Sequence, residues 1–466
     1  MTPRVEHDLL GDREIPADCY YGIQTFRATE NFHITGVAIS HVPELISALA
    51  QVKKAAALAN AKLGVVPPAI AEAIAKACDE IVDGRFHDQF VVDVIQGGAG
   101  TSTNMNANEV IANRAIEILG HKKGEYQHCH PNNHVNCSQS TNDAYPTAFR
   151  LALKPVLDRL MKNMELLQSS FSRKSAEFND VLKMGRTQLQ DAVPMTLGQE
   201  FGAFVTTIGE DVLRVKEAQA LVLEINLGAT AIGTGINAPA EYTGLVTKYL
   251  REITGVPVVT SPNLIEATWD TGAYVQISGV LKRVAVKLSK ICNDLRLLSS
   301  GPRCGLNEIN LPPMQPGSSI MPGKVNPVIP EVVNQVAYQV IGNDLTISLA
   351  AEGGQLQLNV MEPVIAYNLF QSVEMLSRAC ETLAVKCVDG ITANREHCRK
   401  MVVNSIGIVT ALNPVLGYEQ TTQIAKDALA TGRSISDLVL ERRLISKEKL
   451  EQVLSIENLM NPKFFR

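Results

Sequence analysis

ISGVLKRVAVKLSKICNDLRLL, residues 277–298, places apolar side chains three and four positions apart along its whole length. This spacing puts the apolar side chains on one face of a helix and leaves the charged ones on the other. The apolar positions are Ile277, Val280, Leu281, Val284, Leu288, Ile291, Leu295 and Leu298. A helix with such a face must bury it against other helices, so the segment predicts a helical bundle.

The same periodicity recurs on both sides of this segment. It runs through residues 153–171 and 197–215, and further helices are expected at about 328–351 and 363–388. A helix of ~25 residues would be ~38 Å long. Five such helices predict a mainly α protein built on a long five-helix bundle.

The flanking regions differ from this bundle. Region 1–139 is mixed but mostly helical, with proline-started helices expected at Pro43–Leu63 and Pro68–Val82. Helix breakers at Asn413-Pro414 and Gly432 mark a small helical tail. A chain of 466 residues suggests about three domains, which we expect at 1–139, 140–396 and 397–466.

Composition excludes several classes of protein. The net charge is −5 and there is no long basic run, which argues against a nucleic-acid partner. There is no apolar run of membrane-spanning length, and Met1–Leu10 lacks the apolar core of a secretory signal. The nine cysteines form no C-x-x-C pair, which favours reduced thiols in a cytoplasm.

Three segments are unusually rich in hydroxyl and amide side chains: Gly97–Asn106, Ser138–Asp143 and Gly185–Asp191. Each is expected just before or at the start of a helix. A helix N-cap needs one or two polar residues, whereas these segments offer four to seven. Many neutral donors suit a small polyanion, because they surround its oxygens at little desolvation cost.

A fourth segment is a long loop rich in glycine and proline between two predicted helices, and it ends in Gly317–Pro327, GSSIMPGKVNP. A loop of this length in a compact helical protein is usually functional or disordered, and Ile320 and Met321 argue against disorder. Gly317 and Gly323 allow backbone conformations that turn N–H groups inward. Lys324 adds a cation and Asn326 an amide.

Other motifs are weaker. Gly317–Lys324 fails the spacing of a phosphate-binding loop, and Gly233–Ala238 lacks the βαβ context of a dinucleotide site. A histidine and cysteine cluster leaves a zinc site open, but its irregular spacing favours a polar surface loop. Its members are His128, Cys129, His130, His134 and Cys137.

Four ordered blocks resemble the aspartase/fumarase family of lyases. They are residues 138–143, 185–194, 233–237 and 317–327. The resemblance extends over essentially the whole chain, beginning with Arg4, Glu6 and Tyr20-Tyr21-Gly22. It implies the fold of that family, in which a homotetramer has a core of twenty helices, five from each subunit.

The details resemble the aspartases within this family. Thr141 stands where fumarases usually have serine, and Gln188 stands where they have histidine. Gly305–Pro312 and Pro330–Val336 also resemble aspartase sequences. The implied activity is the reversible conversion of L-aspartate to fumarate and ammonia. Class II fumarase is the alternative, followed by a non-catalytic structural relative such as a lens-crystallin-like protein.

The resemblance also implies roles for individual residues. Ser318 corresponds to the family's catalytic base, which removes the C3 proton of the substrate. The β-carboxylate would lie among Thr101, Ser140, Thr141 and Ser319. Lys324 and Asn326 would hold the α-carboxylate. The amino group would lie among Asn142, Thr187 and Gln188.

In this family, loops from three subunits meet in each active site. The sequence agrees with this, because the polar segments lie at the ends of long helices that cannot meet within one chain. The resemblance implies no required cofactor and leaves activation by a divalent cation such as Mg²⁺ open. It implies a small-molecule substrate, no nucleic-acid or membrane partner, and a cytoplasmic enzyme.

Overall fold

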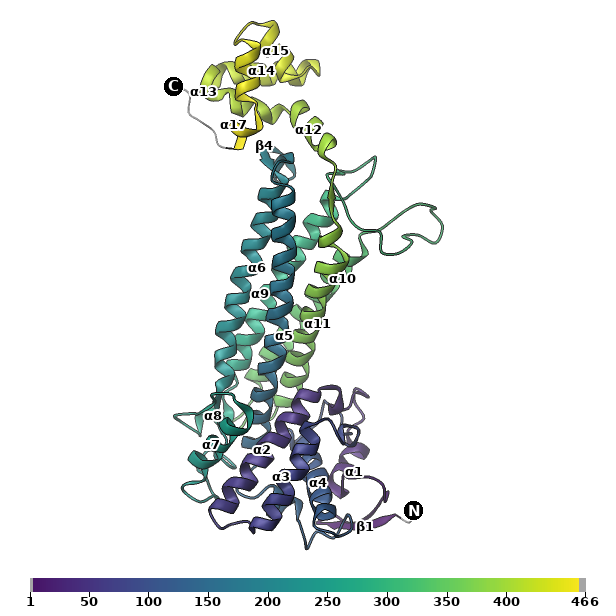
Figure 1. Ribbon diagram of the computed structural model, residues 1–466, viewed down its shortest axis with the longest axis vertical. Coiled ribbons are helices and arrows are strands. Elements are labelled where there is room, and N and C mark those ends of the chain that lie inside the picture. The colour runs from purple at the N-terminus through teal and green to yellow at the C-terminus, as the bar shows by residue number, and fades with distance from the viewer. Residues whose placement is uncertain (1–2, 461–466) are drawn as a thin grey trace. The chain divides into compact units, whose positions relative to one another are not determined.

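A computed structural model describes residues 3–460 of the chain and shows a mainly helical protein (Figure 1). Contacts divide the chain into two compact units. Unit 1 comprises Met1–Met161, Leu213–Arg283 and Gln339–Leu376, and unit 2 comprises Lys162–Val212, Val284–Tyr338 and Ser377–Arg466. The mainly α fold class predicted from the sequence is confirmed.

The first part of unit 1 consists of a strand hairpin and four helices. Strands β1 (Arg4–Asp8) and β2 (Gly11–Ile15) pair antiparallel. Helices α2 and α3 lie side by side and α3 also contacts α4. The helices are α1 (Ile23–Asn31), α2 (Pro43–Lys62), α3 (Pro68–Val82) and α4 (Thr101–Ile118). The two proline-started helices are confirmed, since proline fits the first helical turn.

Five long helices lie where the apolar periodicity predicts them. Each begins in one unit and ends in the other. They are α5 (Thr141–Glu177), α6 (Leu197–Gln219), α9 (Gly272–Leu298), α10 (Val328–Glu352) and α11 (Glu362–Lys386). Helix α5 is longer than its apolar pattern predicts and includes Pro146 and Pro155.

Within unit 1, aromatic and ionic contacts join the parts of these helices that belong to it. The ring of Phe149 in α5 stacks on Tyr274 of α9 and also contacts Phe370 of α11. Asp344 of α10 accepts hydrogen bonds from the side chains of Ser278 and Lys282 in α9. Unit 1 also holds α7 (Tyr242–Thr254), α8 (Glu266–Trp269) and the short parallel strands β5 (Glu224–Ile225) and β6 (Val259–Thr260).

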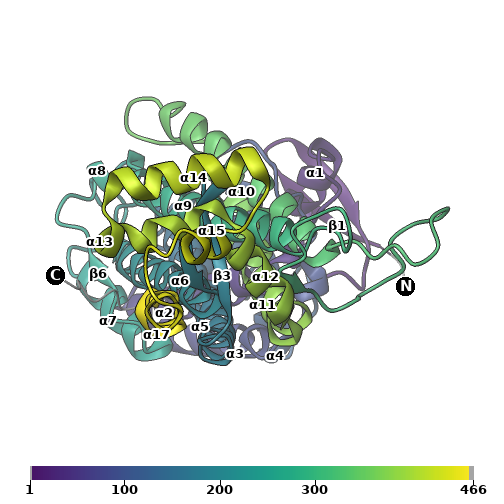
Figure 2. The same ribbon diagram turned by 90° about the horizontal axis from the view of Figure 1, so that it is seen from above.

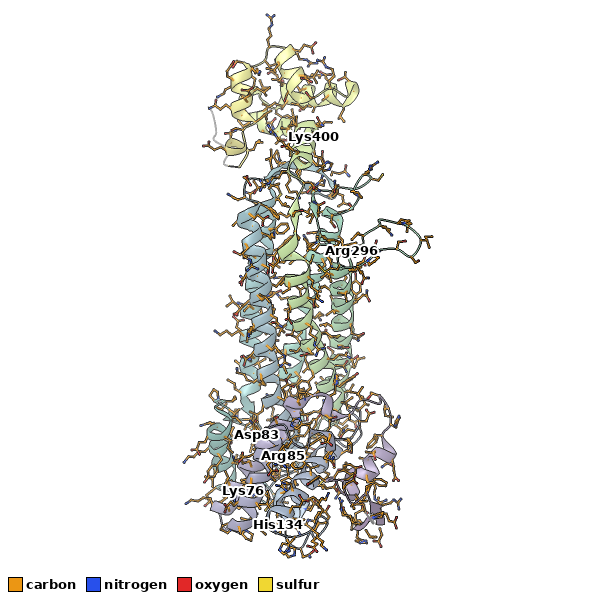
Figure 3. All side chains as sticks on the ribbon, turned by 45° about the vertical axis from the view of Figure 1, so that its right-hand side comes forward. Lys76, Asp83, Arg85, His134, Arg296 and Lys400 are labelled. Atoms are coloured by element: carbon orange, nitrogen blue, oxygen red, sulfur yellow. The ribbon has the colours of Figure 1, made fainter. Side chains whose placement is uncertain are left out.

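Within unit 2, similar contacts join the remaining parts. The ring of Phe171 in α5 packs edge-on against Phe201 of α6. Asn334 of α10 donates to Ser289 of α9 and accepts from Arg296, whose side chain is labelled in Figure 3. The contacts in both units are those expected of packed long helices.

The last part of unit 2 packs a strand hairpin against short helices. Strands β3 (Leu182–Thr187) and β4 (Gln190–Thr196) pair antiparallel. Leu182 and Met184 of β3 join an apolar core with the C-terminal helices, in which α14 and α15 lie together (Figure 2). These helices are α12 (Arg395–Asn404), α13 (Asn413–Leu416), α14 (Tyr418–Thr431), α15 (Ile435–Glu441), α16 (Lys447–Val453) and α17 (Ile456–Met460). Strands β7 (Ile309–Asn310) and β8 (Thr392–Ala393), which are far apart in the sequence, also pair antiparallel in this unit.

Two of the three polar segments begin helices as predicted, α4 at Thr101 and α5 at Thr141. The prediction is wrong for Gly185–Asp191, which forms the turn of the β3–β4 hairpin because β4 precedes α6. The three predicted domains stay a prediction, and their residues 1–2 and 461–466 lie outside the described residues. Within residues 3–460, no helix combines the length and apolar character needed to cross a bilayer.

Candidate active site

Four of the residues predicted to bind substrate lie in unit 1, at the starts of α4 and α5. Thr101 is exposed and its hydroxyl donates to the carbonyl of Gly98. The Ser140 hydroxyl accepts from the Asn142 N–H at 3.2 Å. The Asn142 side chain donates to the carbonyl of Ala231 at 2.8 Å. Ser140, Thr141 and Asn142 are thus held at the first turn of α5, where the partial positive charge of a helix start favours an anion.

A buried polar network lies directly beside this turn. The ammonium of Lys53, a fully buried residue of α2, donates to the side-chain oxygens of Asn136 and Gln139, each at 2.9 Å. Asn104 of α4 donates to the same Asn136 oxygen and to the Thr141 hydroxyl, both at 3.1 Å. The network therefore ties Thr141 to two other helices and fixes its hydroxyl.

The charges in this network shift one another's titration. Burial lowers the pKa of Lys53 to about 7, and the nearby Asp143 carboxylate opposes that shift. Burial raises the pKa of Asp143 to about 6, although the backbone N–H groups of Ser140, Thr230 and Gly228 donate to it and act in the opposite direction. A lysine and an aspartate in one apolar interior partly compensate each other's charge.

Two more predicted residues, Thr187 and Gln188, lie at the β3–β4 turn of unit 2. Gln188 and Leu189 both have positive φ angles, 53° and 63°. Two such residues between paired strands make a type I′ turn, which usually carries asparagine and glycine. Strain of this kind tends to persist where function needs a particular side chain.

A buried ionic cluster supports this hairpin. Glu308 is fully buried, and its carboxylate lies 2.8 Å from the ammonium of Lys183 and 2.5 Å from the guanidinium of Arg186. Lys183 also lies 2.5 Å from Glu200. Burial by itself lowers the pKa of Lys183, but Glu200 and Glu308 raise it above its ordinary value. The cluster fixes Arg186, the residue that precedes Thr187.

The remaining four predicted residues lie in the Gly317–Pro327 loop of unit 2. The Ser318 hydroxyl accepts hydrogen bonds from the backbone N–H groups of Ile320 and Met321, at 3.2 and 2.9 Å. The loop is closed at its base, where the Gly317 N–H donates to the Lys324 carbonyl and the Asn326 amide donates to the Gly317 carbonyl. A Cβ on Gly317 would lie 2.4 Å from the Lys324 carbonyl oxygen, so this closure requires glycine. Ser319 and Lys324 are exposed.

The structure therefore groups the ten predicted residues into three local sets: the α4 and α5 starts, the hairpin turn and the loop. Within unit 2, no described hydrogen bond joins Thr187 or Gln188 to the loop. Sequence reasoning missed Lys53 and Glu308 as supports of these sets. The signal for Lys53 was its position on the buried face of α2, three residues after Ala50 and four after Leu49.

Several side chains of the histidine and cysteine cluster make local hydrogen bonds or are buried. The Nδ1 atoms of His130 and His134 accept backbone N–H groups. Cys129 is buried. Pro131–Val135 forms a short π-helix and not the predicted surface loop. Of the five members of the cluster, His128 also belongs to a group of side chains spaced to hold a metal ion.

Two protein families match the chain. The family described as lyase matches residues 11–342, and the family described as the fumarase C C-terminus matches residues 408–461. The chain belongs to the aspartase/fumarase superfamily of lyases.

Individual relatives agree with this assignment. This lyase is 62% identical to an aspartate ammonia-lyase of Helicobacter pylori, with 99% of each chain covered. A crystal structure of a Brucella melitensis protein, described as fumarate lyase:delta crystallin bound to cobalt, superposes with a TM-score of 0.96 at 57% identity. That comparison covers 98% of this chain and 99% of the other. A class II fumarase of Schistosoma mansoni superposes with a TM-score of 0.93 at 35% identity, with 99% of each covered.

Proposed function

We propose that this lyase is an aspartate ammonia-lyase, which converts L-aspartate reversibly to fumarate and ammonia. The observation that carries the proposal is the 62% identity, over 99% of both chains, to a relative of that name. The class II fumarase is less similar, at 35%. The identity of residue 188 supports the same choice, because glutamine stands where fumarases have histidine.

Ser318 is the proposed base that removes the C3 proton. A serine alkoxide forms only where donors stabilise its negative charge. Two backbone N–H groups already point at the Ser318 oxygen, from Ile320 and Met321. They would hold the alkoxide before substrate binds, since the loop is closed at its base by Gly317 and Asn326.

The other residues hold the substrate and the charge that develops on it. Removing the C3 proton places negative charge on the β-carboxylate. The side chains of Thr101, Ser140, Thr141 and Ser319 stabilise this charge by donating hydrogen bonds. Lys324 and Asn326 hold the α-carboxylate with one charge and one amide. Asn142, Thr187 and Gln188 surround the amino group, which leaves as ammonia and needs no general acid when it enters as ammonium.

A homotetramer brings these sets together in the proposal, with three subunits supplying each active site. The sequence supports it, because the polar segments that hold these residues are expected at the ends of long helices. Exposed apolar residues of the catalytic loop, such as Ile320 at 83% exposure, also suit burial by another subunit.

The proposed location is the cytoplasm, which suits the nine free cysteines of the chain. No cofactor takes part in the proposed reaction. Activation by Mg²⁺ is a separate hypothesis, and comparing the rate with Mg²⁺ and with a chelator across the alkaline range tests it.

Replacing the proposed base tests the mechanism. Ser318→Ala should abolish turnover of aspartate while a dicarboxylate inhibitor such as succinate still binds. Ser299→Ala is the matched control, because the Ser299 hydroxyl only donates to the Arg296 carbonyl at the end of α9. Turnover by Ser318→Ala close to that of the Ser299→Ala control would show that Ser318 is not the base.

A further inference from the structure

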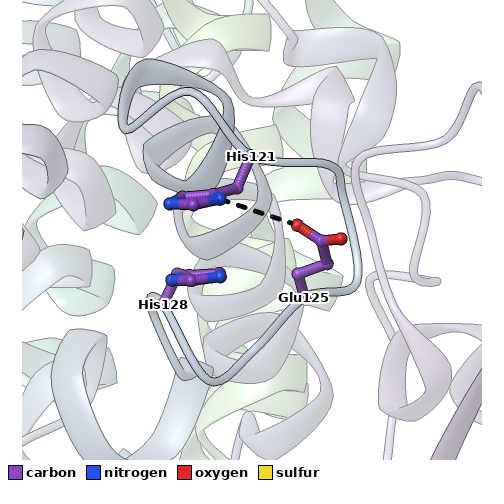
Figure 4. Close-up of side chains that lie close together, drawn as sticks. All are labelled: His121, Glu125 and His128. Atoms are coloured by element: carbon purple, nitrogen blue, oxygen red, sulfur yellow. Dashed lines mark ion pairs between the residues drawn. The ribbon is translucent and has the colours of Figure 1, made fainter.

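Three side chains with metal-binding atoms meet in the loop that follows α4, none of them used in the proposed reaction. One ligand atom from each of His121, Glu125 and His128 lies within 4.8 Å of the other two. The two imidazole rings stack with their centroids 3.4 Å apart and their planes 4° apart. Figure 4 shows both rings beside the Glu125 carboxylate, which lies 3.9 Å from Nδ1 of His121.

Backbone hydrogen bonds hold this loop in place before any ion binds. The His121 N–H donates to the Ile116 carbonyl at the end of α4, and the His128 N–H donates to the Glu125 carbonyl, both at 3.0 Å. The Gly124 N–H donates to the side chain of Asn113 at 2.7 Å. Ligands that are fixed in advance lose little entropy on binding a metal ion.

The Glu125 carboxylate is also oriented by the loop. Its Oε2 atom, which lies 3.9 Å from Nδ1 of His121, accepts from the Lys122 N–H at 3.0 Å, and this bond fixes the carboxylate beside the two rings. The ammonium of Lys123 is directed elsewhere, because it donates to the Asp18 carbonyl and lies 4.2 Å from the centre of the Tyr20 ring. One carboxylate and two imidazoles, which bind metal ions as neutral groups, therefore have ligand atoms within 4.8 Å of one another.

Two imidazoles and a carboxylate form a donor set that selects among metal ions. Histidine nitrogen suits Zn²⁺, Co²⁺ and Ni²⁺, whereas Mg²⁺ prefers oxygen donors in a six-coordinate shell. In a tetrahedral site with metal–nitrogen bonds of about 2.1 Å, two nitrogens lie about 3.4 Å apart, close to the spacing of the stacked rings. The parallel rings must tilt toward each other to aim their lone pairs at one ion, which the exposed His121 ring has room to do.

We propose that His121, Glu125 and His128 bind one borderline divalent ion, Zn²⁺, Co²⁺ or Ni²⁺, with water completing its shell. The ion closes the loop between α4 and α5 and replaces the stacking of two rings by bonds to one centre. The site is separate from the proposed lyase reaction, so its success or failure is independent of that proposal.

Cobalt titration of the purified, metal-stripped full-length chain tests the site. We expect one Co²⁺ per chain with the visible absorption of a low-coordinate Co²⁺ bound by nitrogen and oxygen, and displacement of that Co²⁺ by Zn²⁺. A Cys304→Ser background removes the one exposed cysteine as a competing ligand. Mg²⁺ in large excess should leave the cobalt spectrum unchanged.

Two single variants and a control assign the ligands. His121→Asn and His128→Asn should each weaken Co²⁺ binding at least about tenfold. His33→Asn, a change at an exposed histidine of the same unit, should leave it unchanged. Circular dichroism confirms that each variant is folded. Equal Co²⁺ affinity in His128→Asn and His33→Asn, a thiolate-type spectrum, or displacement of Co²⁺ by Mg²⁺ would each overturn the proposal.

Discussion

Removing the charge of Glu308 should loosen the hairpin that carries Thr187 and Gln188. The Glu308→Gln variant keeps the shape of the side chain but removes its negative charge. Lys183 and Arg186 then face each other across a buried site with only Glu200 to compensate them.

The size of the effect follows from the burial of the cluster. Glu308 is 0% exposed, so water cannot replace the lost charge. Breaking a buried ion pair from one side costs about 3–5 kcal/mol. The amide oxygen of glutamine still accepts one hydrogen bond from Arg186, so we expect a cost of about 3 kcal/mol, at the low end of that range.

Hydrogen exchange of the peptide covering residues 182–196 measures this loss where it occurs. A cost of about 3 kcal/mol corresponds to a roughly 100-fold loss of protection, at about 1.4 kcal/mol for each tenfold. The KM for aspartate should rise as well, because Thr187 and Gln188 lose their fixed position.

Asp180→Asn is the matched control. Asp180 pairs with Arg395 in the same unit, but the two side chains are 73% and 48% exposed. Water screens an exposed ion pair, which therefore contributes little to stability, so protection of the hairpin should barely change. If Glu308→Gln changes protection no more than Asp180→Asn does, the cluster does not support the hairpin as described.

Four further changes test other parts of the structure. Gly22→Ala should destabilise the protein by about 1–3 kcal/mol, because the new Cβ would lie 2.6 Å from the Glu6 carboxylate. Gly244→Ala, in an open position of α7, should instead stabilise it by up to about 1 kcal/mol in urea unfolding. Lys53→Met should flatten the rise of stability between pH 7 and 9. The folded chain releases the Lys53 proton near pH 7 and the unfolded chain near 10.5, so the unfolded state binds more protons in this window and the wild-type stability increases with pH. An equal rise in both proteins would contradict the lowered pKa of the buried Lys53. Gln188→His should alter the pH–rate profile with aspartate without creating malate dehydration, because histidine titrates near neutral pH; measurable fumarase activity would refute this.

The long helices could be predicted because their apolar faces repeat over many turns. The bounds of α3, Pro68–Val82, follow directly from a proline at the first helical position and an apolar period after it. Helix α5 was harder, because Pro146 and Pro155 argue against a continuous helix from Thr141. Packing against α9 and α11 outweighs that local cost.

The β3–β4 hairpin could not be predicted from local signals. Its turn residues, Gln188 and Leu189, are not the asparagine and glycine that usually mark a type I′ turn. The hairpin is stabilised instead by distant residues, namely Glu308 and the apolar core of the C-terminal helices. Such long-range support leaves no trace in the neighbouring sequence.

The residues that support the candidate site, Lys53 and Glu308, could not be predicted for a similar reason. Lys53 follows the helical period of buried residues, but a lysine in a sequence is usually read as solvent-exposed. Only the fold places Asn136 and Gln139 against its ammonium. His121 and Glu125 lie upstream of the dense histidine and cysteine cluster, so the sequence does not mark them as partners of His128.

A side-by-side assay with L-aspartate and L-malate tests the central proposal most directly. The wild-type protein is mixed with each substrate in turn, and fumarate is followed by its ultraviolet absorbance. The proposal predicts fumarate from aspartate, with an equal amount of ammonia, and none from malate. Fumarate formed from malate but not from aspartate would contradict it and make the chain a fumarase.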